Sequence, residues 1–436
     1  MPDKKLYPKT ALALLTALNL LNYIDRNVLF AVQDLIKGEF PRSDAAYGLL
    51  TSVFFIFYMI AAPFMGPLSV RFSRKSVIIV GAVIWSGATL LTAFTKNFDE
   101  LLLRHTLVGI GEASFVILSP TFVADMFSEE KRGRVMGIFY LAIPVGSALG
   151  FLVGGVLGPK YGWRVPFYVG AAPSLLLAFL LLFVPEPPLG QFDVPGKIPE
   201  PSQASAEAPP GIIGFLIRGW KWTWTLLQSL IRNPAFVTAT LGMAMMTFAL
   251  GGLQVWFPTF LHRVHSYTLT QANILFGAST IVNGIVASLA GGWISDWLLR
   301  RTQAAHYIVS AVSLSWGIPA MCFAIFGSGK VMIAGMFTAE FFLLLNTGPL
   351  NAAIINSVGP HVRAMALAAN IFVFHLLGDV PSAPFIGYMS DHFSMRTAFI
   401  APVIAIALSS AILFYGMRFA PPVSAPGPPA PEPIKG

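Results

Sequence analysis

The chain has 436 residues, of which 55% are hydrophobic and only 11% are charged, and its mean hydropathy is +0.70. Soluble chains carry about 25% charged residues, so the excess of apolar residues must face lipid. A net charge of +8 would suit nucleic-acid binding, but the Lys and Arg residues form short clusters between apolar runs. The composition therefore excludes nucleic acid as a partner, and the single cysteine, Cys322, excludes an internal disulfide.

Twelve apolar runs are each long enough to cross a bilayer as a helix. In chain order they lie near 11–35, 46–68, 76–95, 98–125, 134–157, 165–184, 234–261, 269–298, 305–326, 331–357, 364–388 and 397–418. The first run follows three lysines, as the core of a signal peptide would. It continues through Asp25 and Arg26 without a cleavage site, so we expect it to be retained as the first spanning helix.

The basic residues predict how these spans are oriented. An even number of spans places both ends of the chain on one face, and 18 of the 28 Lys and Arg residues fall on that face against 8 on the other. Positive charge accumulates on the cytoplasmic side of membrane proteins. The sequence therefore predicts a multi-pass protein of the inner (plasma) membrane with both termini in the cytoplasm.

Landmarks in the first half of the chain recur in the second. Pro120, Arg134 and Met136 are repeated after 229 residues as Pro349, Arg363 and Met365, and Gly66 is repeated after 226 residues as Gly292. A near-constant displacement indicates two tandem bundles of six helices, related by an axis along the membrane normal. In such folds the solute site lies near mid-membrane between the bundles.

These features divide the chain into four parts. Residues 1–184 are expected to form the first six-helix bundle, and 234–418 the second. Residues 185–233 form a Pro-rich cytoplasmic linker, in which 212–232 suit a helix lying in the headgroup plane because three tryptophans stand beside basic residues. A plain extension of the seventh span remains the alternative. Residues 419–436 are expected to be a disordered tail.

Charged residues inside membrane spans are costly and mark functional sites. Asp25 and Arg26 share the first span, and Glu112 lies midway along the fourth. Neighbours on a helix point about 100° apart, so Asp25 and Arg26 need separate partners from another helix, or water. The pattern predicts proton coupling through a carboxylate switch, in which one acid is protonated in one state and bound to Arg26 in the other. A permanent buried ion network is the alternative.

The second half offers further candidates for the solute site. His375 and Asp379 are one helical turn apart on the same face, and we expect them to line the cavity together with Arg26, Glu112, Trp256, Phe341 and Asn346. His375 and Asp379 have no third ligand in view, so no metal is predicted, and no cofactor is expected. Gly109 and Gly111 lie inside an apolar run, where close helix packing is favoured over a phosphate-binding loop.

A further set of charges lies at the cytoplasmic ends of the spans. Asp296 ends the eighth span and can cap the start of the eleventh or meet Arg363, which would close the cytoplasmic side. The residues expected to gate that side are Arg71, Arg74, Arg134, Asp296 and Arg363. No nucleophile, base and stabilising donor converge anywhere in the sequence, so the chain is not expected to be an enzyme and no catalytic residue is assigned.

The segment from Gly66 to Lys75 resembles the loop motif of the major facilitator superfamily. More specifically, the chain resembles a bacterial member of its spinster family between about residues 15 and 415, through 22–26, 109–114, 119–127, 138–147, 252–261, 346–349 and 375–379. The resemblance implies a cavity between two bundles, export of sphingosine phosphate or lysophospholipids in eukaryotic relatives, and proton involvement of Asp25 and Glu112 beside Arg26.

Two positions depart from the family pattern. Val70 replaces the usual acid of the first loop motif, which puts a cytoplasmic latch in the first half in doubt, whereas Asp296 retains its counterpart. His105 stands where an arginine usually precedes the glycine motif by four positions, and Arg104 is displaced by one. Arg104 then points to a different face, so the usual role of that arginine is not carried over.

The leading hypothesis is a monomeric, proton-linked secondary transporter of a small amphipathic solute of the lysophospholipid or sphingoid-phosphate type. It would work by alternating access among membrane lipids. An organic-anion or sugar-acid proton symporter is the alternative, since a Tyr-x-Asp-Arg element also occurs in that branch. Few basic residues lie within the spans, which favours the lipid. An intramembrane lipid-modifying enzyme lacks a catalytic cluster, and a non-transporting sensor lacks a signalling domain.

Overall fold

The computed structural model describes residues 7–188, 227–359 and 362–421, and this part of the chain is helical without strands. Most of the predicted linker, including residues 212–226 of the predicted interfacial helix at 212–232, lies outside the described residues. So does the predicted tail beyond residue 421.

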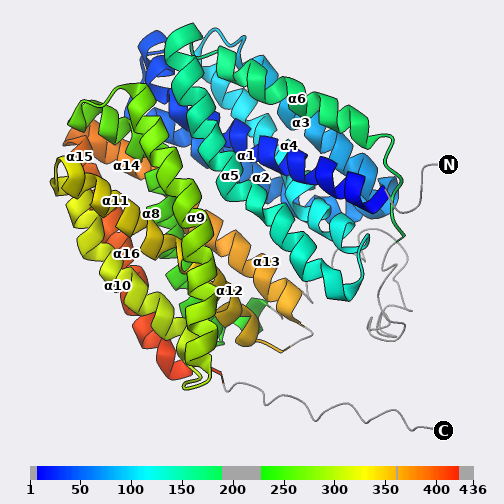
Figure 1. The fold of residues 1–436 in the computed structure, drawn as a ribbon, viewed down its shortest axis with the longest axis vertical. Coiled ribbons are helices and arrows are strands. Elements are labelled where there is room, and N and C mark those ends of the chain that lie inside the picture. Colours follow the sequence, from blue (N-terminus) through cyan, green and yellow to red (C-terminus); the bar gives the residue numbers. More distant parts are fainter. Residues whose placement is uncertain (1–6, 189–226, 360–361, 422–436) are drawn as a thin grey trace.

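One helix corresponds to each of the first six predicted spans. These are α1 (Tyr7–Glu39), α2 (Asp44–Phe72), α3 (Arg74–Thr92), α4 (Phe98–Ala124), α5 (Glu129–Tyr161) and α6 (Val165–Leu181). They gather into one bundle, drawn in blue to green in Figure 1.

The second bundle is less regular. It contains α8 (Pro234–His265), α9 (Leu269–Leu299), α10 (Ala305–Phe326), α11 (Gly329–Leu344), α12 (Thr347–Asn356), α13 (Arg363–Phe374), the π-helix η3 (His375–Asp379), α14 (Val380–His392), α15 (Met395–Ala398), α16 (Ile400–Gly416) and the 3-10 turn η4 (Met417–Phe419). The tenth, eleventh and twelfth predicted spans are therefore each broken into consecutive pieces, and α5 and α9 lie side by side where the bundles meet (Figure 1).

Among the described residues, ten helical segments are long and apolar enough to cross a membrane. The remaining two crossings are α6, which at 17 residues is shorter, and α1, which carries Asp25 and Arg26. The prediction of twelve spans in two six-helix bundles is thus confirmed for the described part of the chain.

Glycines let α4 approach its neighbours closely. A Cβ atom at Gly109 would lie 2.3 Å from the backbone oxygen of Phe54 in α2, and one at Gly111 would lie 2.6 Å from the backbone oxygen of Gly81 in α3. Side chains at these positions would push the helices apart, since membrane helices pack through small residues. The packing interpretation of this glycine pair is confirmed.

The two bundles are joined by charges at one face of the molecule. Arg263 of α8 donates to Asp34 of α1 at 3.0 Å and pairs with Asp44 of α2 at 2.9 Å. Asp391 of α14 accepts the backbone N–H groups of Asp44 and Ala45 at 2.8 and 2.9 Å. We call this side, where α1 ends and α2 begins, the closed face.

The bundles separate toward the opposite face, where α1 begins. Cβ atoms built on Gly66, Gly133 and Gly292 would meet no atom within 4 Å, and Val70 is 88% exposed. By contrast, Gly48 lies against the backbone of Ala383 near the closed face. We call the side where α1 begins the open face, because the ends of α2, α5 and α9 there are not packed against the other bundle.

The ion network predicts how the closed face can be opened. Arg263→Ala removes the ion pairs that join Asp34 and Asp44 to the second bundle, although Asp44 still accepts from the Ser390 hydroxyl of that bundle at 2.8 Å. Charged hydrogen bonds contribute about 1.5–3 kcal/mol each. We expect the population to shift toward opening of this face by about tenfold or more. Distances between spin labels on the α1–α2 and α14–α15 turns will measure the shift. Arg42→Ala, an exposed arginine on the same turn, is the control, and equal distances in the two variants would contradict the assignment.

Candidate functional site

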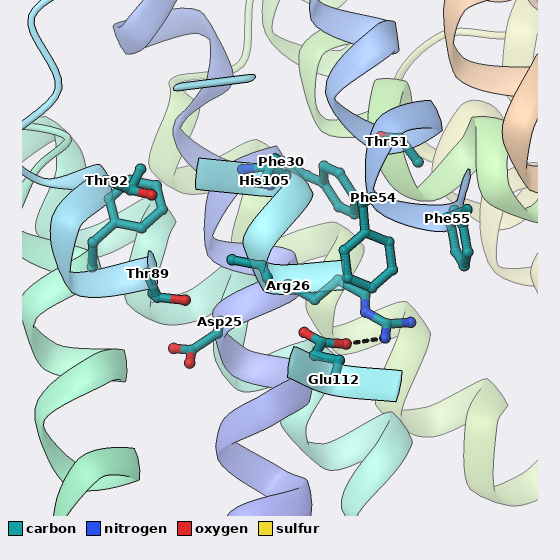
Figure 2. A pocket seen from close by; sticks show the side chains of 12 residues that line it. Asp25, Arg26, Phe30, Thr51, Phe54, Phe55, Thr89, Thr92, His105 and Glu112 are labelled. Atoms are coloured by element: carbon teal, nitrogen blue, oxygen red, sulfur yellow. Dashed lines mark hydrogen bonds and ion pairs between the residues drawn. The ribbon is translucent and has the colours of Figure 1, made fainter. Parts of the chain in front are cut away.

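A buried ion pair joins α1 to α4 near the middle of the first bundle. The Arg26 guanidinium donates to a carboxylate oxygen of Glu112, as the dashed line in Figure 2 marks. The Glu112 side chain is 0% exposed, whereas 19% of the Arg26 side chain remains exposed. A charge in a membrane interior requires a partner, so each of these residues stabilises the ionised form of the other. The exposed part of the Arg26 side chain remains accessible to an anion.

Aromatic rings surround the Arg26 guanidinium. Its Cζ atom lies 4.6 Å from the ring centroid of Phe54, 5.8 Å from that of Phe55 and 5.1 Å from that of Tyr23. Rings at these distances attract a cation through their negative faces. They stabilise the guanidinium without using its donors, which stay available to a carboxylate or phosphate.

Asp25 leaves α1 in a different direction from Arg26 (Figure 2). A Cβ atom on Gly170 of α6 would lie 2.0 Å from its Oδ1 atom, so only a glycine leaves room for the carboxylate. Neither Asp25 oxygen has a donor within normal hydrogen-bond distance among the described residues, and the indole N–H of Trp85, which has no other acceptor, makes only a weaker contact with this carboxylate. The structure thus brings Arg26 and Glu112 together and keeps Asp25 apart from them, as expected for neighbours about 100° apart on a helix.

The second bundle contributes a histidine–carboxylate pair. His375 Nδ1 lies 2.7 Å from Asp379 Oδ2, and the two residues bound the π-helix η3, a rare conformation that is frequent at functional sites. The His375 ring stacks on Phe55 with centroids 4.6 Å apart. Phe55 therefore contacts both bundles, with Arg26 of α1 on its own side and His375 across the interface.

The other predicted solute ligands lie within the packing of the second bundle. Trp256 is fully buried and donates its indole N–H to the Ala383 oxygen at 2.9 Å. Asn346 is also buried, and its Oδ1 accepts from Ser313 at 3.1 Å. Phe341 is partly buried and meets Phe342 edge-on. Trp256 and Asn346 are both 0% exposed in this conformation, so a solute could contact them only after a rearrangement.

The predicted gating residues lie at the open face and are not joined across it. Arg74 pairs with Asp125 and, at 3.5 Å, with Glu186, all within the first half of the chain. The other four are exposed, and none forms an ion pair with another described residue: Arg71, Arg134, Asp296 and Arg363. Contacts among them would require the bundles to approach at this face.

Sequence reasoning did not identify the residues that hold the closed face. From the sequence, Arg263 is only one of the basic residues outside the spans, and no role is predicted for Asp391. Their partners, Asp34 and Asp44, lie more than 200 residues from Arg263 along the chain. No local pattern indicates such pairs, although the acids at the ends of the first two predicted spans were an available signal.

Comparison with known proteins agrees with this geometry. The sequence matches the Major Facilitator Superfamily over residues 15–378. Protein spinster homolog 3 of Danio rerio is 35% identical over 402 residues, which cover 88% of this chain and 77% of that protein. The probable sphingolipid transporter spinster homolog 1 of Arabidopsis thaliana is 30% identical over 421 residues, which cover 89% of this chain and 84% of that protein.

Solved structures share the fold. A bacterial homolog of the human lysosomal transporter spinster, in an inward-facing and unoccupied conformation, superimposes with a TM-score of 0.83 at 24% identity, covering 95% of this chain and 98% of that one. A D-xylose–proton symporter gives a TM-score of 0.73 at 17% identity, covering 95% and 98%. The apolar helices, the paired bundles and the close relatives lead to one conclusion: the chain belongs to the spinster family of the Major Facilitator Superfamily and is a multi-pass membrane transporter, not an enzyme.

Proposed function

We propose that this transporter moves an amphipathic lipid-like solute, of the lysophospholipid or sphingoid-phosphate type, in exchange or together with protons. The observation that carries the proposal is the environment of the Arg26 guanidinium. It is paired with Glu112 and packs against the ring of Phe54, yet part of the Arg26 side chain remains exposed. Such a group suits the anionic head of a lipid. A relative in Danio rerio, 34% identical over 406 residues, is named a sphingosine-1-phosphate transporter, which supports the same solute class.

The two faces of the molecule support transport by alternating access. The closed face depends on ion pairs of Arg263, whereas the charged residues of the open face are exposed and unpaired across it. We propose that closing the open face brings Asp296 toward Arg363 or the start of α13, whose helix N-terminus favours an acid. The two faces would then be closed by different contacts, because Val70 cannot supply the acid usual in the first loop motif.

The proposed orientation rests on charge. The topology predicted from the sequence assigns 18 of the 28 basic residues to the face that holds both termini, and such an excess favours the cytoplasmic side. In the structure, α1 begins at the open face. We therefore propose that the protein lies in the inner (plasma) membrane as a monomer with both termini in the cytoplasm. The conformation described here then opens inward.

The acids of the first bundle predict a pH response. Glu112 is ionised when it binds Arg26, so protonation removes the ion pair, and acidification should deplete the conformation seen here. We expect Asp25→Asn and Glu112→Gln each to abolish this pH-dependent change. Distances between spin labels placed across the open face will report it as pH is lowered.

The control for this pH response is Glu340, a buried acid in the second bundle. Glu340→Gln removes a carboxylate from the second bundle that accepts hydrogen bonds from Ser279 and Thr280, and it should leave the pH response intact. Folded yield must be compared for all variants, since breaking a buried pair costs about 3–5 kcal/mol. A normal pH response in both Asp25→Asn and Glu112→Gln would refute the switch.

The solute class is tested by varying only the lipid tail. Each buried methylene contributes about 0.8 kcal/mol, so affinity for a lysophospholipid series should rise about fourfold per methylene until the tail fills the cavity that we expect between the bundles. Arg26→Gln should weaken all members by a similar factor, because it removes the contact to the head. Binding that is independent of tail length, with tight binding of short hydrophilic acids, would favour the sugar-acid or organic-anion alternative.

A further inference from the structure

A hydrogen-bond donor and a hydrogen-bond acceptor are buried beside each other in the first bundle, and neither has a full partner. Trp85 of α3 is 0% exposed and Asp25 of α1 is 5% exposed. The indole Nε1 atom and both carboxylate oxygens lack a hydrogen bond of normal length among the described residues, and the two side chains make only a weaker contact with each other. An indole N–H can only donate, and an ionised carboxylate can only accept. Each side chain therefore supplies what the other lacks.

Packing holds the indole in place. A Cβ atom on Gly111 of α4 would lie 2.6 Å from the backbone nitrogen of Trp85 and 3.0 Å from its Cβ atom, so α4 presses on the base of this side chain. The Phe115 ring meets the indole edge-on, with centroids 5.3 Å apart. Asp25 has a short side chain that lies against Gly170 of α6 and lines a small cavity. We expect a small rotation of the Asp25 side chain to complete the hydrogen bond.

The surroundings of Asp25 offer it no charged donor. No cation pairs with this carboxylate in the part of the chain that the structure describes. The other charged or titratable groups that line the cavity are Arg26, Glu112 and His105, and the lining from α2, α3 and α6 is uncharged. Arg26 is engaged with Glu112. The neutral indole of Trp85 is then the donor on which an ionised Asp25 depends.

We propose that Trp85 is a positioning residue for proton coupling, whose indole N–H donates to the Asp25 carboxylate when this acid is ionised and releases it when the acid is protonated. The indole keeps its own proton throughout, and only the hydrogen bond forms and breaks. The inference rests on the proposed proton coupling through Asp25 and names the residue that stabilises the ionised form of this acid.

A neutral donor suits an acid that must change its charge. A guanidinium in place of the indole would hold Asp25 ionised, as Arg26 does for Glu112 in this conformation. Without any donor, the charged carboxylate would be strongly disfavoured in a membrane interior. The indole N–H lies between these two cases, so Asp25 can both gain and lose a proton.

The test uses the full-length protein in lipid vesicles and infrared difference spectroscopy. The C=O band of protonated Asp25 is assigned by its loss in Asp25→Asn. Trp85→Phe removes the donor to the ionised form, so protonation becomes easier, and we expect the pH midpoint of this band to rise by about one unit or more. In the unmodified protein an indole N–H vibration should shift with the same midpoint as the band, and this shift should be absent from Asp25→Asn.

Two control variants separate the hydrogen bond from packing. Phe115→Leu removes the ring that meets Trp85 edge-on but keeps the indole N–H. Trp163→Phe removes another buried indole of the same bundle, which donates to Glu39 at 2.8 Å. Both should leave the midpoint of the Asp25 band near that of the unmodified protein. An unmoved midpoint in Trp85→Phe, or an equal shift in Phe115→Leu, would overturn the proposal.

The indole vibration decides the matter if Trp85→Phe does not fold. It is measured in the unmodified protein, and an indole N–H signal that does not change as Asp25 ionises contradicts the hydrogen bond. Failure of proton coupling is recognised separately, by distance probes across the open face that still respond to pH in Asp25→Asn. The Asp25 band and its dependence on Trp85 remain measurable in that case.

Discussion

A guanidinium in the middle of a membrane helix costs about 2.5–3.5 kcal/mol even by the mildest scales, and the first bundle is arranged around that cost. Arg26 is tolerated because Glu112 neutralises it and the rings of Phe54 and Phe55 cover it. Gly109 and Gly111 let α4, which carries Glu112, pack closely against α2, which carries Phe54, and against α3.

The same ion pair is placed to influence the contact between the bundles. Phe55 packs near the Arg26 guanidinium on one side and stacks on the His375 ring on the other. Release of Arg26 from Glu112 would move the ring on which His375 rests. Tyr58 also meets the His375 ring edge-on, with centroids 5.8 Å apart, so aromatic side chains of α2 connect the charged pair to the interface. His375 begins a π-helix, a local irregularity that is frequent at functional sites.

The two buried acids Glu340 and Asp25 differ in how their carboxylate oxygens are hydrogen-bonded. Both oxygens of Glu340 accept hydroxyl hydrogen bonds, from Ser279 and Thr280, and such a satisfied network rigidifies its surroundings. The oxygens of Asp25 accept none at normal distance from the described residues and face a cavity. This difference in hydrogen bonding supports our proposal that proton exchange takes place in the first bundle.

The sequence by itself determined the crossings and the duplicated bundles, because spans of about 20 apolar residues and a constant repeat are local or periodic signals. It also identified Asp25, Arg26 and Glu112, because charges in such spans are conspicuous. Only the tertiary structure decided that Arg26 meets Glu112 while Asp25 points toward Gly170 of α6, and that Arg263 holds the closed face. Those choices depend on helix rotation and on contacts between residues far apart in the chain, which no local pattern encodes.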